Sequence, residues 1–154
     1  MLKKILLSLL LLSSFQLAFS QTASELFRDY SQKRKATYIS LPRAMMSMAT
    51  SKLSDNNLQA VLQDVKSAKV LKLDNSKKSV RKKFIKQVKQ LPKYGYEEFT
   101  RVSGNSDMLV MVKHSASYIS EIAMAYNNGA TCMGVLITGN INPEDLEAII
   151  QMAE

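Results

Sequence analysis

Four apolar segments follow one another in the C-terminal half of the chain, with only short polar links between them. Strands joined by such short links pair as antiparallel neighbours, because a parallel pair needs a crossover of a dozen residues or more. This half of the chain therefore predicts an antiparallel meander. The segments are residues 96–102, 108–113, 118–126 and 131–138, and the links contain Gly104-Asn105, His114-Ser115 and Asn127-Asn128-Gly129.

The remaining chain alternates helical and strand patterns. Thr22-Ala23-Ser24-Glu25 has the sequence of a capping box and predicts a helix start, while Asn142 before Pro143 predicts the start of a last helix. Residues 36–40 and 69–73 are expected to form two further short strands. The fold class predicted is α+β: a two-layer sandwich in which a mostly antiparallel sheet has helices packed on one face.

Residues 77–93, KKSVRKKFIKQVKQLPK, hold eight basic residues and no acid. If these residues form a helix, which turns about 100° per residue, four apolar side chains fall within one arc of its circumference and basic side chains occupy the rest of it. The pattern predicts an amphipathic helix over residues 77–91. The four apolar residues are Val80, Phe84, Val88 and Leu91.

The lysines of this helix form a candidate interaction face. In the simplest interpretation, the ammonium groups are solvated and the aliphatic parts of the lysine side chains cover apolar neighbours. This interpretation is favoured because so small a domain needs the apolar arc for its core. Docking of an acidic protein or a polyanionic glycan is the next alternative, and contact of residues 77–91 with an anionic membrane surface is the third. The face consists of Lys78, Lys82, Lys83, Lys86 and Lys89.

The first twenty residues, MLKKILLSLLLLSSFQLAFS, have the composition of a secretory leader: two lysines, a leucine-rich run and a small-x-small ending. We predict a signal peptide over residues 1–20, cleaved after Ser20, and a single α+β domain over residues 21–154. No cysteine lies near this junction, so a lipid anchor on a new N-terminal cysteine is not expected. The mature protein is expected to be periplasmic or secreted.

Charge is divided unevenly along the chain. Residues 21–93 carry 17 basic and 5 acidic side chains, whereas residues 94–154 carry 2 and 8. An exported chain does not meet cytosolic DNA or RNA, so neither a nucleic-acid partner nor phosphate recognition is expected. The split instead favours an acidic protein, or the chain itself, as the partner.

Cys132 and His114 are the sole cysteine and the sole histidine of the chain. Together they suggest a thiol-dependent hydrolase, because a thiolate beside an imidazolium is a good nucleophile. A lone cysteine in an apolar strand is more often a small buried hydrophobe, and a histidine in a polar turn is usually solvated. We therefore assign no catalytic residue, and one histidine with one cysteine predicts no metal centre or cofactor.

A methionine cluster follows Pro42, at Met45, Met46 and Met48. Such a run is most often part of a core, because the helix that carries it must cover a sheet. The alternative is an adaptable binding groove, since methionine side chains fit irregular surfaces.

Three stretches of the chain resemble the family of domain of unknown function 4252, small exported proteins of Bacteroidetes-type bacteria. The resemblance implies no activity and no catalytic residue. Taken with the charge split, it leads to the hypothesis of an exported, non-enzymatic envelope module that recognises a protein partner or itself. The stretches are LFRDYSQKRKATYISLPRAM, MLVMVKHSASYISEIAMAYNNG and GVLITGNINPEDLEAII.

Overall fold

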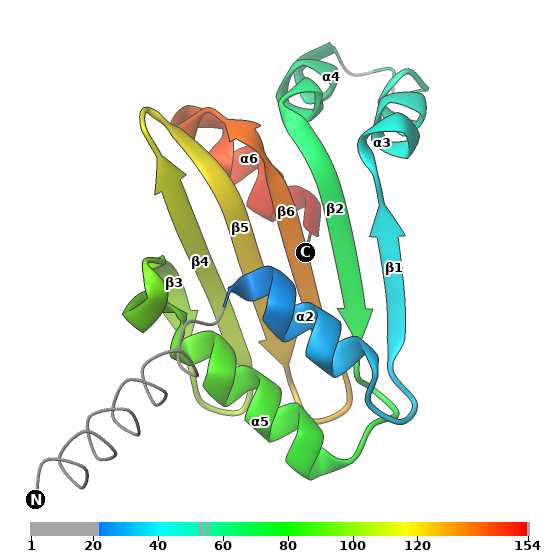
Figure 1. The fold of residues 1–154 in the computed structure, drawn as a ribbon, viewed down its shortest axis with the longest axis vertical. Coiled ribbons are helices and arrows are strands. Elements are labelled where there is room, and N and C mark those ends of the chain that lie inside the picture. The colour runs from blue at the N-terminus through cyan, green and yellow to red at the C-terminus, as the bar shows by residue number, and fades with distance from the viewer. Residues whose placement is uncertain (1–21, 53, 55, 154) are drawn as a thin grey trace, which may run out of the picture.

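The computed structural model describes residues 22–52, 54 and 56–153, so the expected signal peptide lies outside the described residues. Helices and strands are mixed in the first half of the chain, and four consecutive strands precede the last helix (Figure 1). The helices are α2 (Ala23–Ser31), α3 (Arg43–Thr50), α4 (Asn56–Gln63), α5 (Lys78–Lys89) and α6 (Leu146–Ala153), with short 3-10 turns η1 (Leu91–Tyr94) and η2 (Pro143–Asp145). The strands are β1 (Thr37–Leu41), β2 (Val65–Lys72), β3 (Glu97–Val102), β4 (Asp107–Ser115), β5 (Tyr118–Asn127) and β6 (Cys132–Ile141).

The strands form one antiparallel sheet in the order β1-β2-β6-β5-β4-β3. The meander predicted from the four C-terminal segments is β3 to β6, and each member pairs with the next. The β1–β2 hairpin completes the sheet by pairing β2 with β6. The α+β class and the antiparallel sheet are therefore confirmed.

One face of the sheet is covered by α2 and α5, which lie side by side and obliquely across the strands in Figure 1. The rings of Phe27 and Phe84 meet edge to face, with centroids 5.7 Å apart, above Gly134 of β6. The α5 arc predicted from the sequence lies in this core: Phe84, Val88 and Leu91 are buried, and Val80 is partly buried against them.

The opposite face carries a second core, so the helices are not confined to one side as expected. Leu146, Ile149 and Ile150 of α6 pack there against strand residues such as Val112 and Ile122. The sequence contains the physical reason, because the central strands are apolar on both parities and each face must therefore be covered. α3 and α4 lie near one end of β1 and β2 (Figure 1) and contribute partly buried residues such as Met46 and Leu62 to this second core.

Two local expectations differ from the structure. β2 begins at Val65, four residues earlier than the predicted strand, because Val65 is buried and pairs with Gly139 of β6. The methionine cluster is not core throughout: Met45 and Met48 are 53% and 66% exposed, and Met46 alone of the three is partly buried. α3 lies at the end of the β1–β2 hairpin and not over the centre of the sheet (Figure 1), and its residues 43–45, 47 and 48 are exposed.

Candidate functional site

The basic face of α5 is present but is less uniform than its sequence suggests. Lys78, Lys82, Lys83 and Lys86 are exposed, and none of the four forms an ion pair with the part of the chain that the structure describes. Lys89 differs, because its Nζ lies 3.0 Å from Oδ1 of Asp107 at the start of β4. Four of the five predicted residues therefore remain available to a partner.

Cys132 and His114 are not brought together. Asp107, Asn127 and Cys132 pair across β4, β5 and β6, and His114 lies seven residues further along β4. At about 3.3 Å per residue this places the two side chains roughly 20 Å apart. His114 is exposed, with Nε2 3.1 Å from Oε2 of Glu97.

The environment of Cys132 also opposes a nucleophilic role. Its side chain is fully buried, and burial raises the pKa of the thiol to about 12, with the carboxylate of Asp74 adding to the rise and the guanidinium of Arg81 opposing it. A thiol with so high a pKa is almost wholly protonated at neutral pH, and the thiolate is the reactive form.

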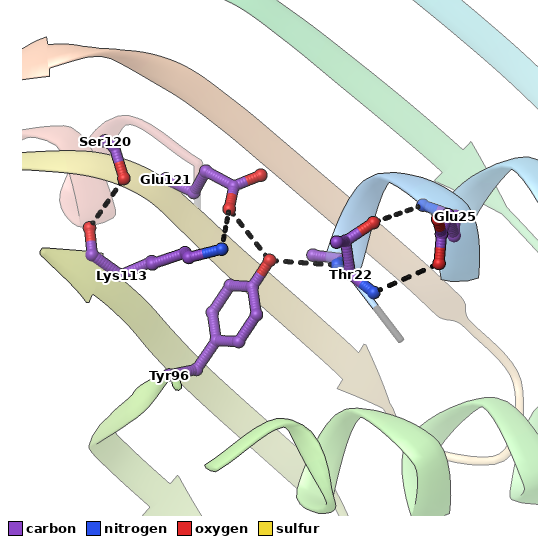
Figure 2. Close-up of polar contacts among 7 residues, drawn as sticks. Thr22, Glu25, Tyr96, Lys113, Ser120 and Glu121 are labelled. Carbon is purple, nitrogen blue, oxygen red and sulfur yellow. Dashed lines mark hydrogen bonds and ion pairs between the residues drawn. The ribbon is translucent and has the colours of Figure 1, made fainter. Parts of the chain in front are cut away.

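Tyr96 forms a buried polar junction between helix and sheet (Figure 2). Its hydroxyl accepts the N–H of Ala23 at 2.9 Å and donates to Oε2 of Glu121 at 2.8 Å. Lys113 lies 3.8 Å from the same carboxylate and 5.3 Å from the centre of the Tyr96 ring. Burial and the neighbouring carboxylate raise the pKa of Tyr96.

This junction fixes the start of α2. The side chain of Thr22 accepts the N–H of Glu25, and the carboxylate of Glu25 accepts the N–H of Thr22, so the predicted capping box is confirmed. Since the hydroxyl of Tyr96 satisfies a further N–H at the helix start, the group is explained as a structural cap.

A different surface lies on the α6 side of the sheet, formed by residues that pair across strands. Directly opposed residues share a face, so the registers define two neighbouring rows on this side. The first row is Ile39, Val70, Val135, Met124, Val110 and Thr100, and the second is Thr37, Lys72, Met133, Tyr126, Met108 and Val102.

Two cavities open along these rows. The first, of about 370 Å³, is lined by β4, β5, β6 and Thr131, with no residue from a helix. The second, of about 290 Å³, lies between the sheet and Met46, Leu62, Ile149 and Met152. Both are lined by Met133 and Val135, so they adjoin at these two residues and are together called here the apolar groove.

The apolar groove is open at the ends of its rows. Ile39 at one sheet edge is 47% exposed and Val102 at the other is 50% exposed. Between these ends Val110 and Met124 are buried, whereas Met108, Tyr126 and Met133 of the second row are partly exposed. An exposed apolar patch of a few hundred Å² is often functional. Of the cluster at Met45, Met46 and Met48, Met46 lines the second cavity, whereas Met45 and Met48 line neither cavity.

Sequence reasoning did not find the apolar groove. The signal available was the apolar character of both parities in the central strands, which the prediction of helices on one face did not use. Finding the uncovered part requires the strand order and the position of α6, neither of which the pattern specifies.

A metal centre and a membrane-spanning helix have no support among the described residues. Within residues 22–52, 54 and 56–153, no three side chains of histidine, cysteine, aspartate or glutamate gather as a metal centre would require. In the same part of the chain, no helix is long and apolar enough to cross a bilayer.

These features define an α+β domain in which one antiparallel sheet lies between two helical layers, one of them incomplete. The chain belongs to the DUF4252 family, a domain of unknown function whose family model matches residues 30–149. No curated protein and no solved structure matched the chain.

Proposed function

We propose that the protein is an exported, non-enzymatic module that binds another protein through the apolar groove. The observation that carries the proposal is the first cavity, whose lining comes from strands and a link and includes no helix. Apolar side chains on a sheet are normally covered by a second layer, and here a partner supplies that layer.

The dimensions of the groove favour one amphipathic helix as the occupant. The two rows along which the groove lies cross six strands, of which β2, β4, β5 and β6 line the cavities. At about 4.8 Å spacing the rows extend about 25 Å, and at about 7 Å apart they cover a height of about 14 Å. A helix with its side chains is about 10–12 Å thick, and about 17 residues span 25 Å. The footprint of about 350 Å² is well below the roughly 800 Å² per partner of a stable protein–protein interface of standard size, which disfavours a flat dimer of two sheets.

Charge at the groove indicates the polar side of that helix. Lys72 is exposed and lies in the second row, between Thr37 and Met133. A helix with acidic residues beside its apolar face would neutralise Lys72, whereas a basic helix would be repelled. The partner segment is therefore apolar on one side and acidic on its flank.

The exported location and the absence of catalysis are parts of this proposal. Export is supported by the composition of residues 1–20. The non-enzymatic character is supported by the separation of Cys132 from His114 and by the raised pKa of the buried thiol.

The test uses a synthetic 18-residue amphipathic helix with leucines on one face and glutamates on its flank. Met133→Glu should weaken binding at least about tenfold, because a charge enters the apolar contact. Met48→Glu is the matched control, since Met48 is exposed and lines neither cavity, and its affinity should stay within about twofold of the unsubstituted protein.

Three outcomes would overturn the proposal. One is no saturable binding of the peptide, and another is equal loss in both variants. The third is that the peptide does not bind, while the protein binds vesicles with anionic lipid or forms a dimer in sedimentation. Met133→Glu would then abolish the vesicle binding or the dimer. In that case the occupant is a membrane or a second copy.

A further inference from the structure

A basic cavity that shares no lining residue with the two cavities of the apolar groove lies where the link between α2 and β1 meets the link between β2 and α5. Its volume is about 450 Å³. Four of its lining residues are cationic, and none of the described residues that line it is acidic. The lining residues are Lys33, Arg34, Lys35, Asn75, Ser76, Lys77 and Val80.

The two links are held against each other by a defined contact. The hydroxyl of Ser76 donates to the carbonyl of Arg34 at 3.0 Å, and Ser76 is buried. Lys35 has φ +64°, a left-handed conformation that costs a residue other than glycine energy. The four cationic residues are thus held around one space although the two segments are some forty positions apart in sequence.

The positive charge of this cavity is not neutralised by ion pairs within the described chain, although the Nζ of Lys33 lies 5.9 Å from the centre of the Tyr30 ring. None of its four cationic side chains is in an ion pair with a described residue. The nearby carboxylate of Asp74 accepts the N–H of Cys132 at 2.6 Å and does not line the cavity.

The start of α5 adds to this positive charge. Lys77 occupies its N-cap position without a side-chain hydrogen bond, and its first turn contains no acid. A helix start carries partial positive charge and favours an acidic cap, so lysines here repel it. An anion in the cavity would reduce both the mutual repulsion of its cationic side chains and their repulsion by the start of α5.

We propose that this cavity binds the phosphate group of a phosphomonoester. A phosphate monoester carries about −1.5 to −2 charge at neutral pH with three acceptor oxygens. Arg34 offers a planar fork of donors to such oxygens, and lysine ammonium groups add compact charge. The volume leaves room for the group that the phosphate esterifies, with the side chain of Asn75 on the wall as a polar contact.

This inference departs from the expectation that phosphate is not recognised. That expectation excluded nucleic acid on the ground of export, whereas small phosphate esters and phosphorylated lipid headgroups are not confined to the cytosol. In the sequence, residues 33–35 and Lys77 are some forty positions apart and contribute only to the total charge of residues 21–93. The fold brings them together.

The test measures binding of glucose 6-phosphate by titration calorimetry at low salt, with glucose as the uncharged comparison. The double substitution Arg34→Gln with Lys77→Gln should weaken binding at least about tenfold, because two charge-assisted contacts are lost. Lys83→Gln with Lys86→Gln is the matched control: it removes the same charge from exposed positions outside the cavity and should change affinity less than twofold.

Vesicles containing phosphatidic acid form a second arm with the same two double variants. If glucose 6-phosphate binds and the double substitution in the cavity weakens that binding, the ligand is a soluble ester. If only the vesicles bind, the ligand is a lipid headgroup. Either supports the site. Absence of saturable binding in both arms, or equal weakening in both double variants, would overturn it. Neither result depends on the apolar groove.

Discussion

At the scale of single residues, the pKa of the Cys132 thiol is determined mainly by burial. Removal from water raises the pKa of the thiol, the carboxylate of Asp74 adds to the rise, and the two together outweigh the lowering by Arg81. We predict that Cys132 does not react with a disulfide-exchange reagent at pH 7.5 in the folded protein and reacts with full stoichiometry in denaturant. Rapid stoichiometric labelling of the native protein would restore the thiol as a candidate nucleophile.

Tyr96 is the residue whose polar contacts contribute most clearly to stability. Tyr96→Phe removes one acceptor for Ala23 and one donor to Glu121, so the free energy of unfolding should fall by about 1–3 kcal/mol in a denaturant titration. Tyr118→Phe is the matched control, since no hydrogen bond of the Tyr118 hydroxyl to a described residue is present, and it should change stability by less than about 0.5 kcal/mol. Equal losses would contradict the role of the junction.

The raised pKa of Tyr96 also predicts a dependence of stability on pH. The folded state holds the hydroxyl protonated, so its contribution is complete below about pH 10, the ordinary tyrosine pKa, and is lost as pH rises above it. The free energy of unfolding should therefore fall between about pH 10 and 11, and Tyr96→Phe should show a shallower fall. Parallel curves for the two proteins would show that another group controls alkaline unfolding.

At the scale of elements, α5 is a basic amphipathic helix whose apolar side packs into the protein's own core. Phe84 is fully buried and Lys83 beside it is exposed. Phe84→Ala should lower the free energy of unfolding by about 3–5 kcal/mol, and Lys83→Ala by less than about 0.5 kcal/mol. A small effect of Phe84→Ala would show that the helix is not docked on the sheet as described.

The packing of α2 and α5 on β6 depends on a residue without a side chain. A Cβ at Gly134 would lie 2.7 Å from the end of the Phe84 ring and 2.8 Å from that of Phe27. Gly134→Ala should therefore cost about 1–3 kcal/mol of stability. The cost should be smaller when Phe84 is also changed to Leu, because the shorter side chain leaves space, and strict additivity in this double-mutant cycle would contradict the contact.

Local patterns were sufficient for most elements, because caps, turns and apolar periodicity act over a few residues. The capping box at Thr22, the arc of α5 and the cap at Asn142 are found as predicted. The start of β2 was missed because it depends on pairing with Gly139, more than seventy residues away. The second helical layer was missed for the same kind of reason, since an apolar strand does not specify which helix covers it.

At the scale of the whole molecule, the incomplete second layer is the feature that carries the proposed function. Two helices lie across one face of the sheet, whereas the other face leaves a groove beside α6. The candidate face on α5 was visible in the sequence because its lysines are close in the chain. The apolar groove and the basic cavity combine residues from distant segments, and only the assembled sheet brings these together.

Methyl NMR of the methionines gives the most direct test of the apolar groove. Met108, Met124 and Met133 line it, whereas Met111 of the same strand as Met108 is buried in the core on the opposite face. On addition of the acidic amphipathic peptide, the signals of the first three should shift in a saturable way and that of Met111 should stay in place. Equal shifts of all four, or no shift of Met133 at saturating peptide, would contradict the account.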